Sequence, residues 1–370
     1  MKTNRLVVIY ICVLILVLSL SLGCKKAVTN KPVKIGVVLE LTGALAPQGE
    51  RTLHGMQIAR DEINQNGGNL ELKVEDSQTN PQFGLNGFNK LIDFDHVDAV
   101  TGGISSSVVM AIAPIANNRN IVFLSSGATS PSISQAGEFI YRLRLSGSDE
   151  VTSMATTLIK DFNYKTTDVV YVNNDYGTGN YKAFLPAYEG LGGKVIYNSG
   201  YAQGNTDFRS IIGKIKSSKS NSIYIIGHSL EIGQFLKQAR ELNLKKQIFS
   251  SVGVEAPEVI KIAGPAADGV IYTIQQYDTQ TAEGFTEKYL QSFNEEPDLF
   301  AVLGYDAIKL LYHVSKDKKD GLEIKKALDS IKDFHGILGN INFDKNGDIV
   351  AHVMTKTIKD GKFIPYVSKK

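Results

Sequence analysis

Apolar and polar positions follow two rhythms along the chain from Val33 onward. Short apolar runs predict β-strands, and longer stretches with an apolar residue every three or four positions predict helices. In the first part of the chain we predict strands at 33–39, 70–76, 98–101 and 121–124, and helices at 53–66, 80–94 and 108–118. Strands separated by helices of this length favour a parallel sheet with right-handed crossovers.

A second run of the same kind begins near Ser146 and predicts a second, similar lobe. Its expected strands are 168–172, 194–197, 222–226, 247–250 and 269–272, and its expected helices are 148–161, 179–191, 207–217, 230–242 and 257–263. Helices at 282–293, 300–315 and 322–331 follow, and then strands at 340–344, 349–358 and 363–367. Turn pairs Asn346-Gly347 and Asp360-Gly361 make these last strands antiparallel, at the edge of one lobe.

Small residues follow the third and fourth strands of the first run, at 102–107 and 125–130. Ligands of open α/β sheets bind beyond the carboxyl ends of the strands, where glycine allows close approach and helix N-termini favour anions. Backbone amides and the hydroxyls of Ser105, Ser106 and Thr129 would suit a small carboxylate. The alternative is that both loops are ordinary turns with capping residues.

The first residues indicate a targeting segment. Lys2 and Arg5 precede an almost wholly apolar stretch, 6–22, and then comes Cys24. This resembles the bacterial lipoprotein signal, which implies a signal peptide at 1–23, acylation of Cys24 and a polar tether at 24–32. Ser21 departs from that pattern, which has Leu, Val or Ile there, and the alternative is an uncleaved N-terminal anchor. Either places the folded part outside the cytoplasmic membrane.

Composition removes several function classes. Lys and Arg number 40 against 38 Asp and Glu, and no basic stripe suggests nucleic acid. Both cysteines, Cys12 and Cys24, belong to the targeting segment, so the mature chain has no disulfide and no thiol ligand. The six histidines lack metal-ligand spacing, and no nucleophile–base motif or cofactor loop stands out. We therefore predict no catalytic residue, no metal and no cofactor.

Several short motifs carry a family resemblance through their order and spacing. They are 34–37 with 41–43, Asp61-Glu62-Ile63-Asn64, 105–107, 127–131, Asn174-Asp175-Tyr176-Gly177 and Gly304-Tyr305-Asp306-Ala307. With them the chain resembles the solute-binding proteins of ABC transporters for branched-chain amino acids and related ligands. The resemblance implies the type I periplasmic binding protein fold, α/β with two Rossmann-like lobes of mainly parallel sheet and a three-stranded hinge. It implies a first lobe of 33–147 plus 277–335, a second of 148–276 plus 336–370, and a monomer.

The resemblance also implies site residues in the cleft. It assigns the ligand carboxylate to Ser106, with Ile104 and Ser105 beside it, and to the loop of Gly127, Ala128 and Thr129. Tyr176 would face the ligand from the second lobe.

Two positions depart from the amino-acid binders. His228 stands where they have a tyrosine, and Val252 stands where they have the acid that pairs with the ligand ammonium. Glu255, three residues later, is the alternative acid. Either Glu255 or another group serves, or the ligand is not an α-amino acid, because a buried ammonium without an anion is costly.

The expected function is therefore capture of a small carboxylated solute, a branched-chain or related amino acid, and its delivery to an ABC permease. The protein would be held to the membrane by its lipid. The alternatives are a sensor feeding a chemosensory or kinase receptor, a binder of another carboxylate, and an enzyme of the cell surface.

Overall fold

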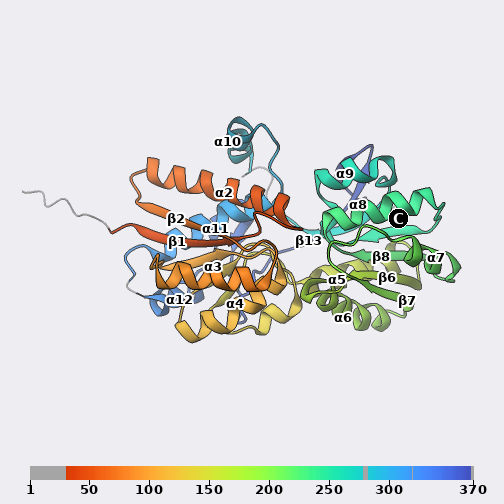
Figure 1. The fold of residues 1–370 in the computed structure, drawn as a ribbon, viewed down its shortest axis with the longest axis horizontal. Helices are drawn as coiled ribbons and strands as arrows, with labels where there is room; N and C mark the ends of the chain where they lie inside the picture. Colours follow the sequence, from red (N-terminus) through yellow and green to blue (C-terminus); the bar gives the residue numbers. More distant parts are fainter. Residues whose placement is uncertain (1–30, 278–281, 319, 368–370) are drawn as a thin grey trace, which may run out of the picture. The chain divides into compact units, whose positions relative to one another are not determined.

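The computed structural model describes residues 31–277, 282–318 and 320–367. From Val33 onward the chain forms one compact unit with two large sheets, each covered by helices (Figure 1). The α/β prediction with two lobes of mainly parallel sheet is confirmed. The predicted signal peptide and Cys24 lie outside the described residues. Among the helices that are described, none has the length and apolar character needed to cross a bilayer.

The first lobe is built on a five-stranded parallel sheet in the order β2-β1-β3-β4-β5. Its strands are β1 (Val33–Leu39), β2 (Leu70–Asp76), β3 (Ala99–Gly102), β4 (Phe123–Ser125) and β5 (Ile140–Arg142). The helices between them are α2 (Ala46–Gln65), α3 (Pro81–Asp93) and α4 (Ser106–Arg119), with a 3₁₀ turn, Pro131–Gln135, before β5.

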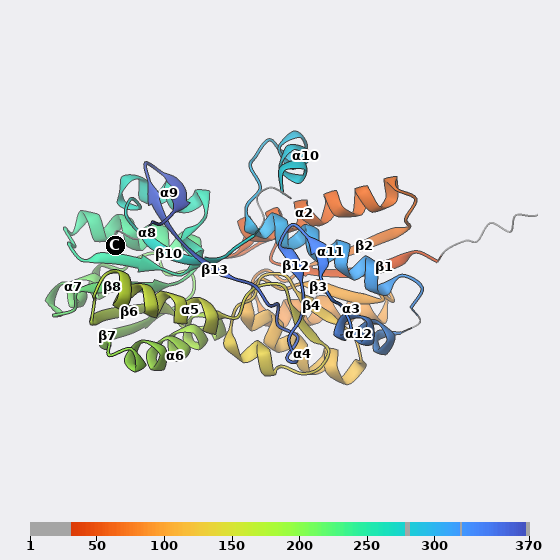
Figure 2. The same ribbon diagram turned by 180° about the vertical axis from the view of Figure 1, so that it is seen from behind.

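Alternation along β1 places helices on both faces of this sheet. Ile35, Val37 and Leu39 pack into one buried cluster, whereas Val38 packs into another with residues of α3 and α4. The first face is covered by α2 and by α11 (Leu299–Ser315), which returns from the C-terminal part of the chain (Figure 2). A strand covered on both faces is buried on both, which explains the apolar run from Ile35 to Leu39 in β1.

The second lobe repeats the same strand order, β7-β6-β8-β9-β10, and adds antiparallel β13 and β14 at the β10 edge. Its parallel strands are β6 (Thr166–Val172), β7 (Lys194–Tyr201), β8 (Ser222–Ile226), β9 (Gln247–Ser250) and β10 (Ile271–Gln275). Its helices are α5 (Gly147–Thr156), continued by a π turn to Asp161, α6 (Asp175–Gly190), α7 (Arg209–Ser217), α8 (Ser229–Glu241) and α9 (Pro257–Ala263). The shared order confirms the prediction of two similar lobes.

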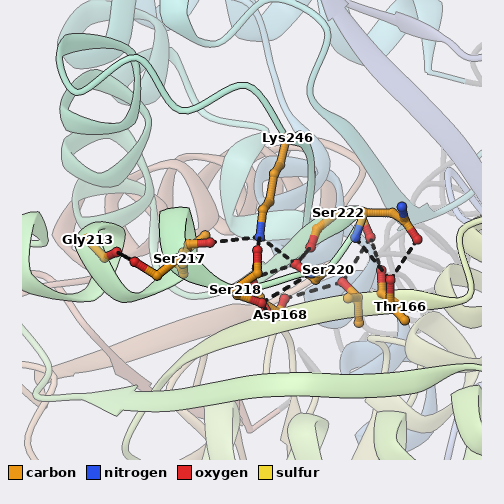
Figure 3. A network of polar contacts seen from close by, with 11 residues as sticks. Thr166, Asp168, Gly213, Ser217, Ser218, Ser220, Ser222 and Lys246 are labelled. Atoms are coloured by element: carbon orange, nitrogen blue, oxygen red, sulfur yellow. Dashed lines mark hydrogen bonds and ion pairs between the residues drawn. The ribbon is translucent and has the colours of Figure 1, made fainter.

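A buried polar network lies near the amino ends of β6 and β8 (Figure 3). Asp168 is fully buried and accepts hydrogen bonds from Ser218 Oγ at 2.7 Å and Ser220 Oγ at 2.6 Å. Lys246 Nζ pairs with the same carboxylate at 3.1 Å. The network ties the turn before β8 to β6, at the opposite end of the sheet from the strand tips that face the first lobe.

The C-terminal part contributes to both lobes. It comprises α10 (Glu283–Phe293), α11, α12 (Gly321–Asp329) and the strands β11 (Phe334–Gly336), β12 (Gly339–Ile341), β13 (Val353–Lys359) and β14 (Lys362–Pro365). The expected antiparallel edge is β13 with β14. Residues 336–349 contact first-lobe groups, since Asp306 accepts from the amides of Ile337 and Leu338 and Arg142 pairs with Asp348. The predicted lobe boundaries, including the one at Gly336, stay predictions.

Several elements differ from the predicted bounds, and two of the differences have a clear physical reason. Helix α2 begins seven residues earlier than the apolar pattern suggests, because its first turns bury the polar side chains of Gln48, Arg51 and Thr52. Strand β5 was not predicted, because it has three residues only and one of them is the fully buried Arg142.

Candidate functional site

A narrow cavity of about 40 Å³ lies where the strand tips of the two lobes meet. We call it the interlobe cavity. Its lining residues come from both lobes: Leu45, Gln48, Ile104, Gly127, Thr129, Arg144, Tyr176, Gly227, His228, Val252, Gly253 and Phe300.

The two lobes present equivalent loops to this cavity. Ile104 and Thr129 follow the third and fourth strands of the first lobe, β3 and β4. His228 and Val252 follow β8 and β9, the third and fourth strands of the second. Beside the third strand the order of connection reverses, and open α/β sheets bind ligands at that point. The repeated topology therefore places two binding edges face to face.

Six of the ten predicted ligand-binding residues line the interlobe cavity, and four do not. The six are Ile104, Gly127, Thr129, Tyr176, His228 and Val252. The four that the cavity lining leaves out are Ser105, Ser106, Ala128 and Glu255. The binding roles of all ten stay predictions.

The amides at the tip of β3 are already occupied by a side chain of the protein. Ile104 N and Ser105 N each donate to the carboxylate of Glu40 at 3.0 Å. Glu40 is fully buried, and that burial raises the pKa of its carboxyl to about 7. The expected anion cradle at this tip is thus filled from within. Its sequence signal was a glutamate directly after the apolar run of β1.

The predicted hydroxyls separate into two kinds. Ser106 Oγ accepts from Ser130 N at 3.1 Å and so ties two loops together. Thr129 Oγ1 is buried and has no hydrogen-bond partner among the described residues. A buried hydroxyl without a partner costs free energy unless something else satisfies it. Of the predicted hydroxyls, Thr129 is therefore the one that lines the cavity without a partner among the described residues.

Two stacked rings form part of the second-lobe wall. Tyr176 and His228 lie with ring centroids 5.3 Å apart and planes 21° from parallel. His228 Nε2 lies 3.3 Å from Asn174 Nδ2. Burial lowers the pKa of the His228 imidazole and raises the pKa of the Tyr176 phenol, so both rings are neutral near pH 7.

Glu255 is engaged elsewhere. Its carboxylate pairs with Lys356 Nζ on β13 at 2.6 Å. Val252 lines the cavity as expected and carries no charge. Among the described residues that line the cavity, none is Asp or Glu.

Sequence reasoning gave no binding role to Arg144, which lines the cavity with a fully buried side chain. Arg144 Nη1 donates to Gln275 Oε1 at 3.2 Å, and Nη2 lies 2.5 Å from Glu150 Oε1. The available signal was a second arginine two residues after Arg142, within the otherwise apolar stretch 139–145. Leu45, Gln48 and Phe300 were also not predicted to bind ligand, because they lie on helices α2 and α11 or beside them.

Direct contacts join the lobes around the cavity. Gln48 Nε2 donates to Ser229 Oγ at 2.9 Å. Arg51 pairs with Asp298 at 2.7 Å within the first lobe and with Glu258 of α9 at 3.1 Å across the cleft. Within the described part of the chain, no group of three His, Cys, Asp or Glu side chains is arranged to hold a metal ion.

Comparisons with known proteins agree with this arrangement. A family model described as "Periplasmic binding protein" matches residues 32–360. The Leu/Ile/Val-binding protein homolog 1 of Brucella melitensis is 28% identical over 345 residues, covering 90% of this chain and 92% of that protein.

Two solved structures share the fold. The leucine binding protein LivK of Thermotoga maritima is 28% identical with a TM-score of 0.84, and the match covers 90% of this chain and 98% of that one. The branched-chain amino acid transporter substrate binding protein LivJ of Streptococcus pneumoniae, in complex with isoleucine, is 26% identical with a TM-score of 0.83 and the same coverage.

Proposed function

The chain belongs to the periplasmic binding protein family, and from that premise we propose that it captures a small carboxylated solute in the interlobe cavity and delivers it to an ABC permease. The observation that carries the proposal is the composition of the cavity wall, to which both lobes contribute equivalent loops. A ligand that touches both lobes stabilises the conformation in which they meet, and a hinge motion releases it.

Two ligand classes have support. The similarity to a Leu/Ile/Val-binding protein homolog and to a LivJ in complex with isoleucine favours a branched-chain or related amino acid. A cavity whose described lining holds Arg144 and no acidic side chain favours a carboxylate that carries no ammonium group. Both classes leave the proposed capture and delivery unchanged.

Native mass spectrometry of the purified full chain tests capture directly, because a tightly held solute adds its mass. A thermal-shift screen over amino acids and organic acids tests it independently. A solute that binds only the folded state raises the unfolding free energy, by about 2.7 kcal/mol when its concentration is 100 times its Kd, and the melting temperature rises with it. We expect at least one small carboxylate to do so. A chain that holds no solute and responds to none would overturn the proposal.

An uptake experiment distinguishes a transport protein from a sensor, because only the transport protein delivers its solute into the cell. We expect cells lacking this protein to lose uptake of the labelled solute, and cells carrying it to regain that uptake. Intact uptake together with a lost chemotactic or kinase response would instead support the sensor. A product assay with the bound solute addresses the enzyme alternative, and we expect no turnover.

Membrane attachment rests on Cys24, which lies outside the described residues. We propose acylation there, with residues 1–23 removed and 24–32 as a tether, and an extracytoplasmic monomer. Labelled palmitate should enter the wild-type chain and not the Cys24→Ala variant. Equal labelling of both would contradict the lipoprotein assignment.

A further inference from the structure

Arg144 lies on the connection that leads from β5 of the first lobe to α5 of the second. The connection is held in place by Gln275 at the end of β10. Gln275 Oε1 accepts from Leu145 N at 2.7 Å, and Gln275 Nε2 donates to Leu143 O at 3.0 Å. The guanidinium is therefore mounted on a fixed backbone at the floor of the interlobe cavity.

A guanidinium carries five N–H donors, and those of Arg144 are only partly used. Nη1 donates to Gln275 Oε1, and Nη2 pairs with Glu150 Oε1. Nε is buried and has no hydrogen-bond acceptor among the described residues. An oxygen of water or of a ligand would satisfy it.

Two other lining side chains have a buried polar atom without a hydrogen-bond partner among the described residues, Thr129 Oγ1 and the acceptor Gln48 Oε1. Thr129 is the one that can donate. Its hydroxyl is a donor, as is Arg144 Nε–H, so a carboxylate suits both. The remaining wall is mostly apolar, with Leu45, Ile104 and Phe300 on the first-lobe side. A molecule that fits this wall has one anionic end and an apolar body.

Four acids outside the cavity lining, Glu40, Glu150, Glu231 and Glu255, each have a partner within the protein, although Glu150 Oε1 and Glu255 Oε2 make no hydrogen bond among the described residues. Glu40 accepts the amides of Ile104 and Ser105, and Glu150 pairs with Arg144. Glu231 accepts from the backbone amides of Gly204 and His228, and Glu255 pairs with Lys356. An α-ammonium buried here would have no anionic partner in the described lining, which is costly.

Resting on the proposed function, we propose that Arg144 binds the ligand carboxylate directly, together with Thr129, and that the cavity selects apolar carboxylates without an α-ammonium over α-amino acids. The ligand carboxylate would thus be bound by the Arg144 side chain, whereas the backbone amides at the tip of β3 donate to Glu40.

Matched ligands test the selectivity by calorimetry on the full chain. The pairs are 4-methylpentanoate with L-leucine and 3-phenylpropanoate with L-phenylalanine, which share a carbon skeleton and differ at the α-amino group. We expect the acid without the amino group to bind at least about tenfold more tightly in one pair or both, a factor that corresponds to one charged-group contact. Tighter binding of either amino acid, or no binding by any of the four, overturns the inference.

Variants test the contact itself. We expect Arg144→Gln to lower the affinity for the preferred carboxylate by about thirtyfold and to change the affinity for its carboxamide analogue less than threefold, with Arg144→Lys between them. A purely structural Arg144 would change both affinities equally. Arg119→Gln, on the exposed end of α4, removes one charge as the control. If Arg144→Gln does not fold, wild-type discrimination between carboxylate and carboxamide decides, and equal affinities overturn the inference.

Different results would contradict the proposed solute-binding function and the proposal for Arg144. Binding of L-leucine alone would leave the solute-binding function standing and remove the inference. A chain that binds no solute in mass spectrometry or in the screen would remove both.

Discussion

Gln48 in the first turn of α2 donates a hydrogen bond to Ser229 Oγ at the start of α8, with 2.9 Å between Nε2 and Oγ. Both side chains are buried, and they belong to different lobes. Gln48 Oε1 has no hydrogen-bond partner among the described residues, and Gln48 lines the interlobe cavity. One residue therefore joins the lobes and presents a free acceptor to the solute.

We predict that the Gln48–Ser229 bond stabilises the solute-bound conformation. Gln48→Ala and Ser229→Ala should each weaken solute binding by about 1 kcal/mol, and the double variant should lose less than the sum, because one hydrogen bond is removed in all three. Calorimetry on the four proteins measures the coupling. Gln82→Ala on α3 is the control, since its side-chain amide donates to Asn86 on the exposed face. Strict additivity would contradict the prediction.

Thr129 and Ser106 should respond differently to loss of their hydroxyls. Thr129→Val removes an unpaired donor from the cavity, so we expect solute affinity to fall by about 1–2 kcal/mol with little change in unfolding free energy. Ser106→Ala removes the acceptor of Ser130 N outside the cavity lining, so we expect mainly a loss of stability, about 1 kcal/mol. Urea denaturation and calorimetry on both variants separate the effects, and the reverse assignment would contradict this account.

Much of the fold could be predicted from local pattern. The bounds of β1, β2, β8, β9 and α9 are those that the sequence predicts. Each is a short segment whose apolar residues form a run or alternate with polar ones, and such signals are local. Where a buried face is polar, as at Gln48 and Arg51 in α2, the same reasoning fails.

For the candidate site, the sequence predicted which loops meet, because the order of the strands determines that. It did not predict the hydrogen bonds of the polar groups. Loops after parallel strands gather at one edge, so Ile104, Thr129, His228 and Val252 were found from strand ends and resemblance. The state of the polar groups there depends on distant partners. Glu40 meets amides 64 and 65 positions away, and Arg144 meets Gln275 131 positions away. No local pattern carries that information.

Glu40 should make the stability of the protein depend on pH. Burial raises the pKa of its carboxyl to about 7, from 4.5 in the unfolded chain. The neutral form is favoured in the folded state, so its contribution is complete below pH 4.5 and is lost as pH rises to 7. Raising the pKa by this amount corresponds to about 3 kcal/mol.

We therefore expect the stability of wild type relative to Glu40→Gln to fall by about 3 kcal/mol between pH 4.5 and 8, because the amide does not titrate. Urea denaturation across this range measures the difference. Asp306→Asn is the matched comparison. Burial raises the pKa of the Asp306 carboxyl to about 6, from 3.8, so its difference curve should level off at lower pH. Parallel curves for wild type and Glu40→Gln would contradict the assignment.

Lys246 should matter for stability and not for binding. Its ammonium donates to Ile215 O at 2.7 Å, Ser218 O at 3.0 Å and Ser220 Oγ at 2.8 Å, besides pairing with the buried Asp168 (Figure 3). Lys246→Met leaves that carboxylate buried without its cation, and breaking a buried pair in this way costs about 3–5 kcal/mol.

Because the Lys246 network lies away from the interlobe cavity, this variant tests whether stability and solute binding depend on separate regions. The network lies at the amino ends of β6 and β8, whereas the interlobe cavity lies beyond the carboxyl ends of the strands. We expect urea denaturation to show the loss for Lys246→Met and calorimetry below the transition to show solute affinity within twofold of wild type. Lys245→Met, at the exposed neighbouring position, should change the unfolding free energy by about 0.5 kcal/mol or less. A large loss of affinity in Lys246→Met with unchanged stability would mean that the amino ends of the second-lobe strands are coupled to the cavity.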